Sequence, residues 1–350
     1  MDSLGAAPAG TRRKGIALPG TSKGTAAEAR KGRLLADSSS ERPARRMNKS
    51  EWIQAEVVQA FAAEETDAYR LYTADDGWAD RYGPDILISY KTEVARERLT
   101  TELYLWSLAV NFKFTRVFAR FLPKQNAERA TPQLVVGDPE PNLPVVAMER
   151  SLRYGIDFES GYSVGLFVDQ RENRSFVRRS KPKTLLNCFS YTCAFSVAAA
   201  SVGAETVSVD LSKKSLARGK ENFALNLLST DGHRFVTEDV MEFLPRLARK
   251  GEKYDIIILD PPTFSRSHKG KAFQVEEDFE RLLSMALELA PRDSRILLST
   301  NCTTFNERAL EVAARYCMKI ARRAGSFHRE PELPDFPRGS GARTVWLTLR

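Results

Sequence analysis

The sequence has no long apolar run, few histidines and no closely spaced cysteine pair. A membrane-spanning helix needs roughly 18 consecutive apolar residues, so we expect none here. Three histidines and four cysteines without a Cys-x-x-Cys pair argue against a structural zinc site or a disulfide scaffold. The cysteines are Cys188, Cys193, Cys302 and Cys317. We therefore predict a soluble, cytoplasmic protein that uses neither a metal nor a membrane.

A charge excess is also missing from most of the chain, although the net charge is +8. Residues 1–46 hold ten Lys and Arg against four Asp and Glu, so this segment carries most of the excess. It is rich in Ala, Gly, Ser, Pro and Arg and lacks apolar periodicity, which predicts a disordered basic tail. Three interpretations stay open: a transit peptide, an arm that contacts phosphates, or translation that begins at Met47.

Two regions of different pattern follow the tail, and we predict two domains, 47–150 and 151–350. The first is expected to be a small α+β accessory or substrate domain. Its predicted helices are Glu51–Ala63 and Glu97–Ala109. Strands are predicted in and next to it at Thr115–Leu122, Val145–Met148 and Tyr154–Phe158. Proline and glycine in Thr131–Pro144 predict an exposed loop.

The second region alternates short β-rich runs with helical stretches. This alternation predicts a parallel sheet with helices on both faces. The expected strands are Thr184–Phe189, Thr206–Leu211, Arg234–Thr237, Tyr254–Asp260, Arg295–Asn301 and Arg343–Leu349. The expected helices are Ala194–Val202, Ser212–Leu228, Val240–Lys250, Val275–Ala290 and Phe305–Ala324.

Ligands of such sheets bind at the carboxyl ends of the strands, where this sequence places three aspartates. Asp210 lies about 20 residues after the first strand end, the distance of an acid that binds ribose hydroxyls. Asp239 suits an adenine amino group or a helix cap, whereas Ser212 already suits the cap after Asp210. No glycine stands between Lys181 and Gly203, which disfavours a pyrophosphate-containing cofactor such as NAD.

A resemblance rests on two long motifs. LLNCFSYTCAFSVAAASVGAETVSVDLSKKSLARGKENFALN, followed by DIIILDPPTFSRS, resembles class I S-adenosylmethionine-dependent methyltransferases, especially the bacterial 23S ribosomal RNA methyltransferases of the I and K/L types. GLFVDQRENR, residues 165–174, is similar to the segment before that family's catalytic domain. The resemblance implies an α/β fold: a Rossmann-like methyltransferase domain with a mostly parallel seven-stranded sheet, preceded by a small α+β domain. The RNA-binding PUA domain of the I type is not recognisable.

The resemblance also implies a cofactor site for S-adenosylmethionine. Its residues would be Asp169, Arg171, Ser190, Tyr191, Thr192, Asp210, Leu211, Ser212, Asp239, Val240 and Asp260. Residues 190–192 would wrap the methionine and ribose part, and Arg171 would pair with the cofactor carboxylate. Asp169 and Gln170 would cover the pocket. Cys193 departs from the family, since many relatives have glycine there.

Two acceptor chemistries are compatible with the sequence. A base nitrogen needs no covalent nucleophile, and the segment Asp260, Pro261, Pro262 and Phe264 would present a carboxylate and a stacking ring to it. The order D-P-P-T-F-S is similar to the K-type guanine-N7 enzymes. Cytosine C5 instead needs a thiolate. The I-type relatives place theirs at the position of Thr300, so Cys302 lies two residues, roughly 6–7 Å, too late. We favour nitrogen.

A basic loop follows the catalytic segment. Arg266, His268, Lys269 and Lys271 suit contacts with RNA phosphates, or form a solvated loop. The predicted function is therefore methylation of a guanine-like base nitrogen in ribosomal RNA. Alternatives are cytosine-C5 methylation through Cys302 and a protein or small-molecule acceptor. An oxidoreductase is disfavoured by the missing glycine loop, and an inactive RNA-binding module by the three intact aspartates. The oligomeric state stays open.

Overall fold

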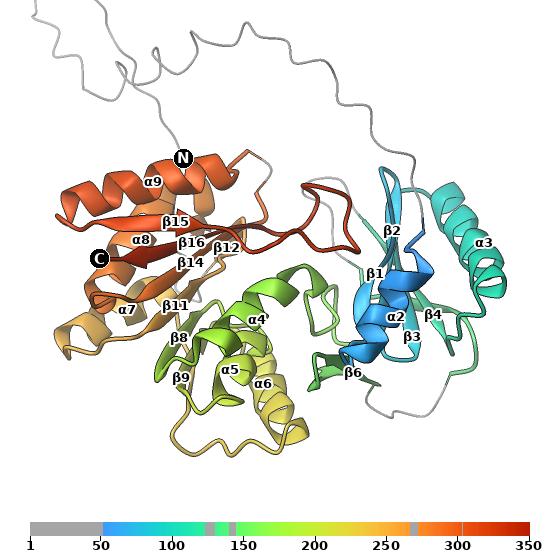
Figure 1. The fold of residues 1–350 in the computed structure, drawn as a ribbon, viewed down its shortest axis with the longest axis horizontal. Helices are drawn as coiled ribbons and strands as arrows, with labels where there is room; N and C mark the ends of the chain where they lie inside the picture. Colours follow the sequence, from blue (N-terminus) through green and yellow to red (C-terminus); the bar gives the residue numbers. More distant parts are fainter. Residues whose placement is uncertain (1–51, 123–129, 140–144, 267–271, 303) are drawn as a thin grey trace, which may run out of the picture. The chain divides into compact units, whose positions relative to one another are not determined.

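The computed structural model describes residues 52–122, 130–139, 145–266, 272–302 and 304–350 (Figure 1). The predicted basic tail, residues 1–46, lies outside them. No helix within the described ranges is long and apolar enough to cross a membrane.

The N-terminal part is a five-stranded sheet with two helices. Its strands, in the order β1-β2-β3-β4-β5, are Ala68–Ala74, Gly77–Tyr82, Asp85–Tyr90, Val117–Phe121 and Gln133–Val136. The helices are α2, Ala55–Ala63, and α3, Glu93–Ala109. Since α3 joins β3 to β4, these two strands run parallel, and the other pairs are antiparallel. The sheet confirms the small α+β domain of the predicted fold class.

The local differences from prediction in this part have local causes. Helix α3 begins four residues earlier than expected because the Thr92 side chain accepts a hydrogen bond from the Ala95 N–H. The predicted loop Thr131–Pro144 contains a strand, β5, which pairs with β4 and so satisfies its backbone there. Residues 140–144 of that loop lie outside the described ranges.

A hairpin and a short helix lead into the second part. Strands β6, Val145–Glu149, and β7, Leu152–Ile156, correspond to two predicted strands, and they pair antiparallel. The turn between them falls at residue 150, the predicted domain boundary, and the division itself stays a prediction. The segment similar to the family's pre-domain motif forms a 3₁₀ turn, η1 (Val168–Gln170), and helix α4 (Arg171–Ser180). The apolar pattern had not indicated α4.

The second part is a seven-stranded sheet in the order β10-β9-β8-β11-β14-β16-β15. Its strands are β8 (Thr184–Cys188), β9 (Glu205–Asp210), β10 (Arg234–Thr237), β11 (Ile256–Leu259), β14 (Arg295–Thr300), β15 (Gly325–His328) and β16 (Arg343–Leu349). The first five in spatial order are parallel, and β16 is antiparallel to both neighbours. After β8 the chain adds β9 and β10 on one side, and it then returns to add β11 and β14 on the other side of β8. The carboxyl ends of β8 and β11 are therefore the switch point of the sheet. The predicted sheet is confirmed; only β15 was missed.

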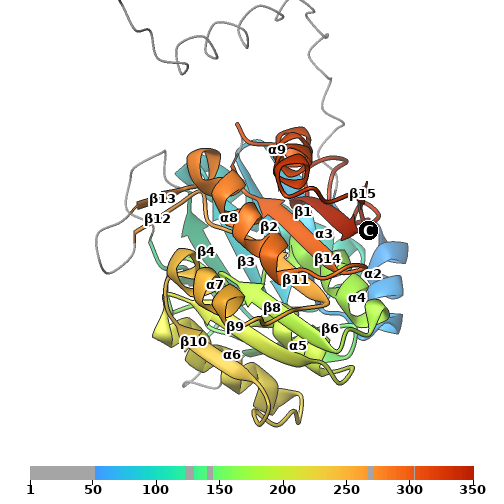
Figure 2. The same ribbon diagram turned by 90° about the vertical axis from the view of Figure 1, so that its left-hand side faces the viewer.

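Helices cover both faces of this sheet (Figure 2). They are α5 (Ala194–Ala200), α6 (Lys213–Leu225), α7 (Val240–Arg249), α8 (Val275–Leu289) and α9 (Glu307–Ile320). Strand β11 shows the two-sided burial: Ile257 and Leu259 pack with α7, α8 and α9, whereas Ile256 and Ile258 pack with α4 and α5. A strand buried on both faces needs the continuous apolar run that IIIL supplies.

Candidate cofactor and acceptor site

The register of the parallel strands brings the predicted site residues to one edge. Leu259 lies beside Cys188 on one side and Leu298 on the other. The loop after β8, Asp260 after β11 and Ser299 near the end of β14 therefore share the switch-point edge.

The loop after β8 turns tightly without any glycine. Phe189, Tyr191 and Cys193 have left-handed backbones, with φ of 57°, 46° and 60°. The Ser190 N–H donates to Val209 O at 3.0 Å, and the Cys193 N–H donates to Ser190 O at 2.8 Å. Non-glycine residues in this conformation cost free energy, so the surrounding bonds must hold them. Such a held turn is typical of a functional site.

Cys193 fits because a neighbouring helix has made room for it. Its side chain is buried, and a Cβ on Gly219 of α6 would collide with its Sγ. The resemblance led us to expect a glycine at 193. In this protein the glycine is at position 219 instead, and its missing side chain leaves room for the thiol of Cys193.

The side chains of Ser190 and Thr192 face the protein. Both are buried. The Thr192 hydroxyl donates to Gly165 O at 2.5 Å, and its carbonyl accepts from Asn222 Nδ2 at 2.9 Å. These bonds tie the loop to the segment before η1 and to α6. The loop can therefore offer a cofactor its backbone more readily than these two hydroxyls.

Asp210 is bound by backbone groups on both carboxylate oxygens. Its Oδ2 accepts from the Tyr191 N–H and its Oδ1 from the Ser212 N–H, both at 2.8 Å. Ser212 caps α6, as predicted, because its Oγ accepts from the Ser215 N–H at 3.1 Å. Burial raises the pKa of the Asp210 carboxyl. Each oxygen can accept a second bond, and Leu211 and Ser212 beside it are partly exposed.

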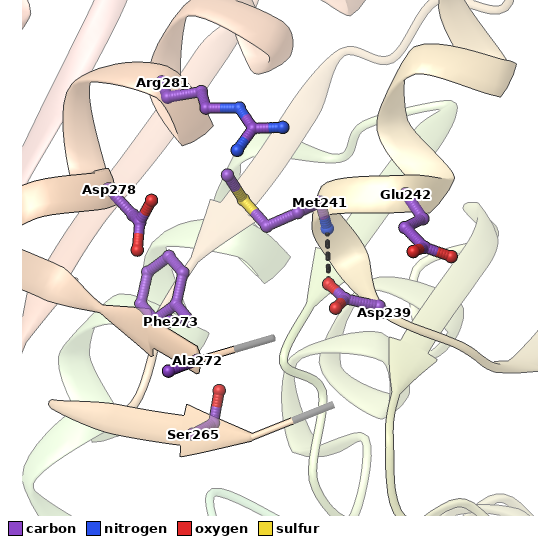
Figure 3. Close-up of a pocket in the computed structure, with 8 residues that line it drawn as sticks. All are labelled: Asp239, Met241, Glu242, Ser265, Ala272, Phe273, Asp278 and Arg281. Atoms are coloured by element: carbon purple, nitrogen blue, oxygen red, sulfur yellow. Dashed lines mark hydrogen bonds between the residues drawn. The ribbon is translucent and has the colours of Figure 1, made fainter. Parts of the chain in front are cut away.

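Asp239 does cap the next helix, the second of its two predicted roles. Its Oδ1 accepts from the Met241 N–H at 2.9 Å at the start of α7. It also borders a cavity of about 60 Å³ that Met241 and Phe273 line with apolar atoms (Figure 3). Val240 is buried in the core behind this cavity. The cavity also has charged side chains on its border, among them Glu242 and Arg281. Because Asp239 borders the cavity while it caps α7, capping and ligand binding are compatible.

Asp260 differs from Asp210 and Asp239 because one of its carboxylate oxygens is buried without a hydrogen-bond donor among the described residues. Its Oδ1 is buried and finds no hydrogen-bond partner among the described residues. Its Oδ2 lies 3.5 Å from Gln170 Nε2. Burial, with the nearby Asp169 as a smaller cause, raises the pKa of the Asp260 carboxyl to about 6. A buried acceptor without a partner is costly, which makes this oxygen a candidate ligand-binding atom.

Behind Asp260 lies a chain of side-chain hydrogen bonds that sequence reasoning had missed. Gln170 Nε2 donates to Ser299 Oγ at 3.1 Å, and Asn173 Nδ2 donates to Gln170 Oε1 at 2.8 Å. The Trp346 indole N–H donates to Asn173 Oδ1 at 2.9 Å. All four side chains are buried, so the amide of Gln170 is held toward Asp260. Gln170, which was expected to cover the pocket, and Asn173 both belong to the GLFVDQRENR motif, whereas Ser299 and Trp346 carried no such signal.

The predicted contact of Arg171 with a cofactor carboxylate stays a prediction, and its side chain has partners within the protein. Its side chain is fully buried and forms a salt bridge with Asp335, with Nη2 2.5 Å from Oδ1. It also donates to Ala68 O at 3.3 Å and lies over the ring of Phe61. Both terminal nitrogens of the guanidinium are therefore occupied, whereas Nε is buried without a partner among the described residues. We assign Arg171 the role of joining α4 to the N-terminal sheet.

Asp169, by contrast, stays at the site. It is partly buried, and burial raises the pKa of its carboxyl, whereas Arg70 and Arg174 lower it. Arg174 is itself paired with Glu149, with Nε 2.7 Å from Oε1. Asp169 thus adds a second carboxylate near Asp260.

The remaining predicted residues fall in two groups. In the catalytic segment, Pro261 is buried, Pro262 is partly buried and Phe264 is 51% exposed. Phe264 begins β12 (Phe264–Arg266), which pairs with β13 (Ala272–Gln274). The backbone of Arg266 lies in β12. The predicted contacts of the Arg266 side chain, and His268, Lys269 and Lys271, lie outside what the structure describes.

Cys302 is buried in the core that α8 and α9 form. Its Sγ lies 3.1 Å from Thr304 Oγ1 and 3.6 Å from Glu276 Oε1. In the described ranges, no group of three or more His, Cys, Asp and Glu residues could hold a metal ion.

A model of the S-adenosylmethionine-dependent methyltransferases matches residues 86–347. The chain belongs to this family. The predicted enzyme class, fold class and cofactor are confirmed at the level of the family.

Individual relatives agree with this membership. YwbD from Bacillus subtilis (strain 168), provisionally assigned as a ribosomal RNA large subunit methyltransferase, is 35% identical over 59% of this chain and 54% of its own length. Ribosomal RNA large subunit methyltransferase K/L from Shewanella sp. (strain MR-4) is 32% identical over 84% of this chain and 42% of its own length. The chain thus spans about half the length of the curated relatives it matches.

Among solved structures, SMU.776 is provisionally assigned as a methyltransferase and was crystallised in complex with SAH (S-adenosylhomocysteine). It has 27% sequence identity and a TM-score of 0.69, and the match covers 86% of this chain and 83% of that one.

Proposed function

We propose that this chain transfers the methyl group of S-adenosylmethionine to a base nitrogen of ribosomal RNA, with guanine as the favoured base. The observation that carries the proposal is the carboxylate of Asp260, whose buried Oδ1 has no partner among the described residues. The N–H groups on a guanine edge are the donors that such an oxygen requires.

The residues at the strand ends fit the cofactor. S-adenosylmethionine, when bound, supplies an electrophilic methyl group on a sulfonium. Asp210 would accept hydrogen bonds from the ribose hydroxyls with the capacity its oxygens retain. Asp239 and the cavity beside it would hold the adenine edge. The backbone of residues 190–192 would follow the methionine part, and Asp169 would lie near the positive charge.

The segment after β11 would hold the acceptor base. Asp260 Oδ1 would accept from the base edge, which fixes the ring plane and the position of the attacking nitrogen. Pro261 and Pro262 restrict the backbone that follows. The exposed ring of Phe264 offers a stacking surface. For guanine N7 no proton leaves the base, and the carboxylate of Asp260 would stabilise the positive charge that develops on the ring.

RNA is the proposed acceptor for two reasons. The curated relatives reported above carry the name of ribosomal RNA large subunit methyltransferases. The chain also has basic residues directly after the catalytic segment, at Arg266, Lys269 and Lys271. If these residues contact phosphates, RNA affinity should fall as the salt concentration rises. A cytoplasmic location stays a prediction.

The test is methylation followed by nucleoside analysis. The protein is incubated with labelled S-adenosylmethionine and undermethylated large-subunit ribosomal RNA, which is then digested to nucleosides. We expect label in a methylguanosine, in equal amount with the Cys302→Ala variant.

Label in 5-methylcytidine that disappears in Cys302→Ala would overturn the nitrogen proposal and restore the cytosine alternative. If the protein binds S-adenosylhomocysteine but transfers no label to RNA, the acceptor is not ribosomal RNA. Transfer to a protein or small molecule would then be the next measurement.

A further inference from the structure

Phe167 is an exposed aromatic residue between two buried ones. Its side chain is 45% exposed, whereas those of Leu166 and Val168 are 3% and 4% exposed. The neighbours anchor the chain in the core, so Phe167 projects outward from a fixed backbone. A large apolar side chain left in water at such a place forgoes a stabilising burial that a ligand can recover.

The contacts of Phe167 place it at the site. Gln170, three residues further on, lies 3.5 Å from Asp260 Oδ2. The ring centroid of Phe167 lies 5.6 Å from that of Tyr191, in the loop after β8. The Phe167 carbonyl accepts from Arg174 Nη2 at 2.8 Å and from the Gln170 N–H at 3.3 Å. The ring is therefore held beside both the loop after β8 and the segment that reaches Asp260.

We propose that Phe167 is a second stacking residue for the acceptor base. The inference rests on the proposed function, because the ligand is the flat heterocycle that Asp260 is proposed to orient. Phe264, four residues after Asp260, and Phe167, three residues before Gln170, are both exposed aromatics on segments that meet at this carboxylate. With one ring supplied by each segment, an unstacked base would be held while its edge faces Asp260. Stacking on an aromatic ring stabilises a bound base whichever base it is.

The competing role for Phe167 is to cover the cofactor, given its contact with Tyr191. The two roles differ in which equilibrium depends on the ring. A base-stacking ring affects RNA and leaves cofactor affinity unchanged. A cofactor-covering ring affects S-adenosylhomocysteine binding in the absence of RNA.

The experiment compares three variants with the wild type. Phe167→Ala removes the ring, Phe167→Tyr keeps it, and Tyr316→Ala on α9 removes an equally exposed ring as a control. Initial rates with labelled S-adenosylmethionine and ribosomal RNA give kcat/KM for RNA, and calorimetry gives the Kd for S-adenosylhomocysteine. We expect Phe167→Ala to lower kcat/KM for RNA by roughly 5- to 150-fold, with an unchanged Kd. Phe167→Tyr and Tyr316→Ala should match the wild type.

Wild-type kcat/KM in Phe167→Ala would overturn the inference. So would a Kd for S-adenosylhomocysteine that weakens as much as kcat/KM falls, since the ring then covers the cofactor. If the wild type itself transfers no label to RNA, the proposed function fails first and the inference fails with it. An active wild type together with an active Phe167→Ala variant refutes the inference alone.

Discussion

Asp210 ends β9 and Asp260 follows β11, two strands of one sheet that β8 separates, and the two carboxylates have different surroundings. Both carboxylate oxygens of Asp210 accept backbone N–H groups, one from the loop after β8 and one from the start of α6. Asp260 has one oxygen 3.5 Å from an amide donor, and its other oxygen is buried without a partner among the described residues.

This difference indicates two different roles for the two carboxylates, one structural and one in ligand binding. A carboxylate whose oxygens are already used holds the backbone in place and offers a ligand its remaining capacity. A carboxylate that lacks a partner is stabilised chiefly when a ligand arrives. The causes of the pKa shifts also differ between the two carboxylates. Burial raises both pKa values. Two backbone hydrogen bonds oppose this rise at Asp210, whereas at Asp260 one side-chain hydrogen bond, with Ser299, opposes it and the charge of Asp169 adds to it.

The largest expected effect tests this division at Asp260. Asp260→Asn keeps the shape and removes the charge, so we expect methyl transfer to fall about 100-fold or more, with cofactor affinity changed less than about twofold. In the wild type the rate should decrease as the pH falls below about 6, because protonation removes the same charge. Initial rates at saturating RNA and cofactor, measured between pH 5 and 8, check both statements.

If Asp260→Asn keeps the wild-type rate, Asp260 has no role in methyl transfer. A variant that loses cofactor affinity and rate together would mean that Asp260 holds the cofactor rather than the base, and the contrast with Asp210 would disappear.

The second prediction concerns Asp210, where the same substitution should lower stability and cofactor affinity. Asp210→Asn replaces one acceptor with a donor that faces a backbone N–H, either that of Tyr191 or that of Ser212. We expect a loss of about 2 kcal/mol in the free energy of unfolding, since one buried donor loses its partner. Cofactor affinity should fall as well, because the loop after β8 loses its anchor. Urea denaturation and calorimetric titration with S-adenosylhomocysteine measure the two losses, and intact values for both would refute the anchoring role.

Much of this site could be predicted because its signals are local. The run IIIL before Asp260 predicts a strand buried on both faces, and Ser212 followed by a helical pattern predicts a cap. The fold class followed from the alternation of such runs. Each of these inferences needs only residues that are close in the sequence.

The rest depends on partners that are distant in the sequence. Arg171 looked available for a cofactor, but its partner, Asp335, lies 164 residues away. The side chains behind Asp260 reach from Asn173 to Trp346. Whether Asp260 Oδ1 finds a donor is decided by everything packed around it, so no local pattern could reveal that it does not.

The third prediction concerns the room that the loop after β8 requires. In Gly219→Ala the new Cβ meets Cys193 Sγ and lies 3.0 Å from Cys193 Cβ. We expect a loss of about 2 kcal/mol in the free energy of unfolding through overpacking. Adding Cys193→Gly removes the collision and suits the left-handed backbone at 193, so the double variant should recover most of the loss. Denaturation of the single and double variants gives the coupling, and strictly additive losses would show that the two positions are independent.

The smallest expected effect is a pH-dependent difference in folding stability between Asp260→Asn and the wild type. Because the folded protein raises the pKa of this carboxyl from 3.8 to about 6, ionising it disfavours folding. The destabilisation is absent below the unfolded pKa and grows as the pH rises through the folded one. Asp260→Asn cannot ionise, so its stability relative to the wild type should be about 1 kcal/mol more favourable at pH 8 than at pH 5.

Comparing the two pH values cancels any constant effect of the amide and leaves the charge of Asp260 together with its coupling to Asp169 and Arg174. Denaturant unfolding of both proteins at the two pH values measures it. A difference that does not depend on pH would mean that water already satisfies Oδ1, and the residue that we expect to be essential for methyl transfer would then carry no stability cost for the fold.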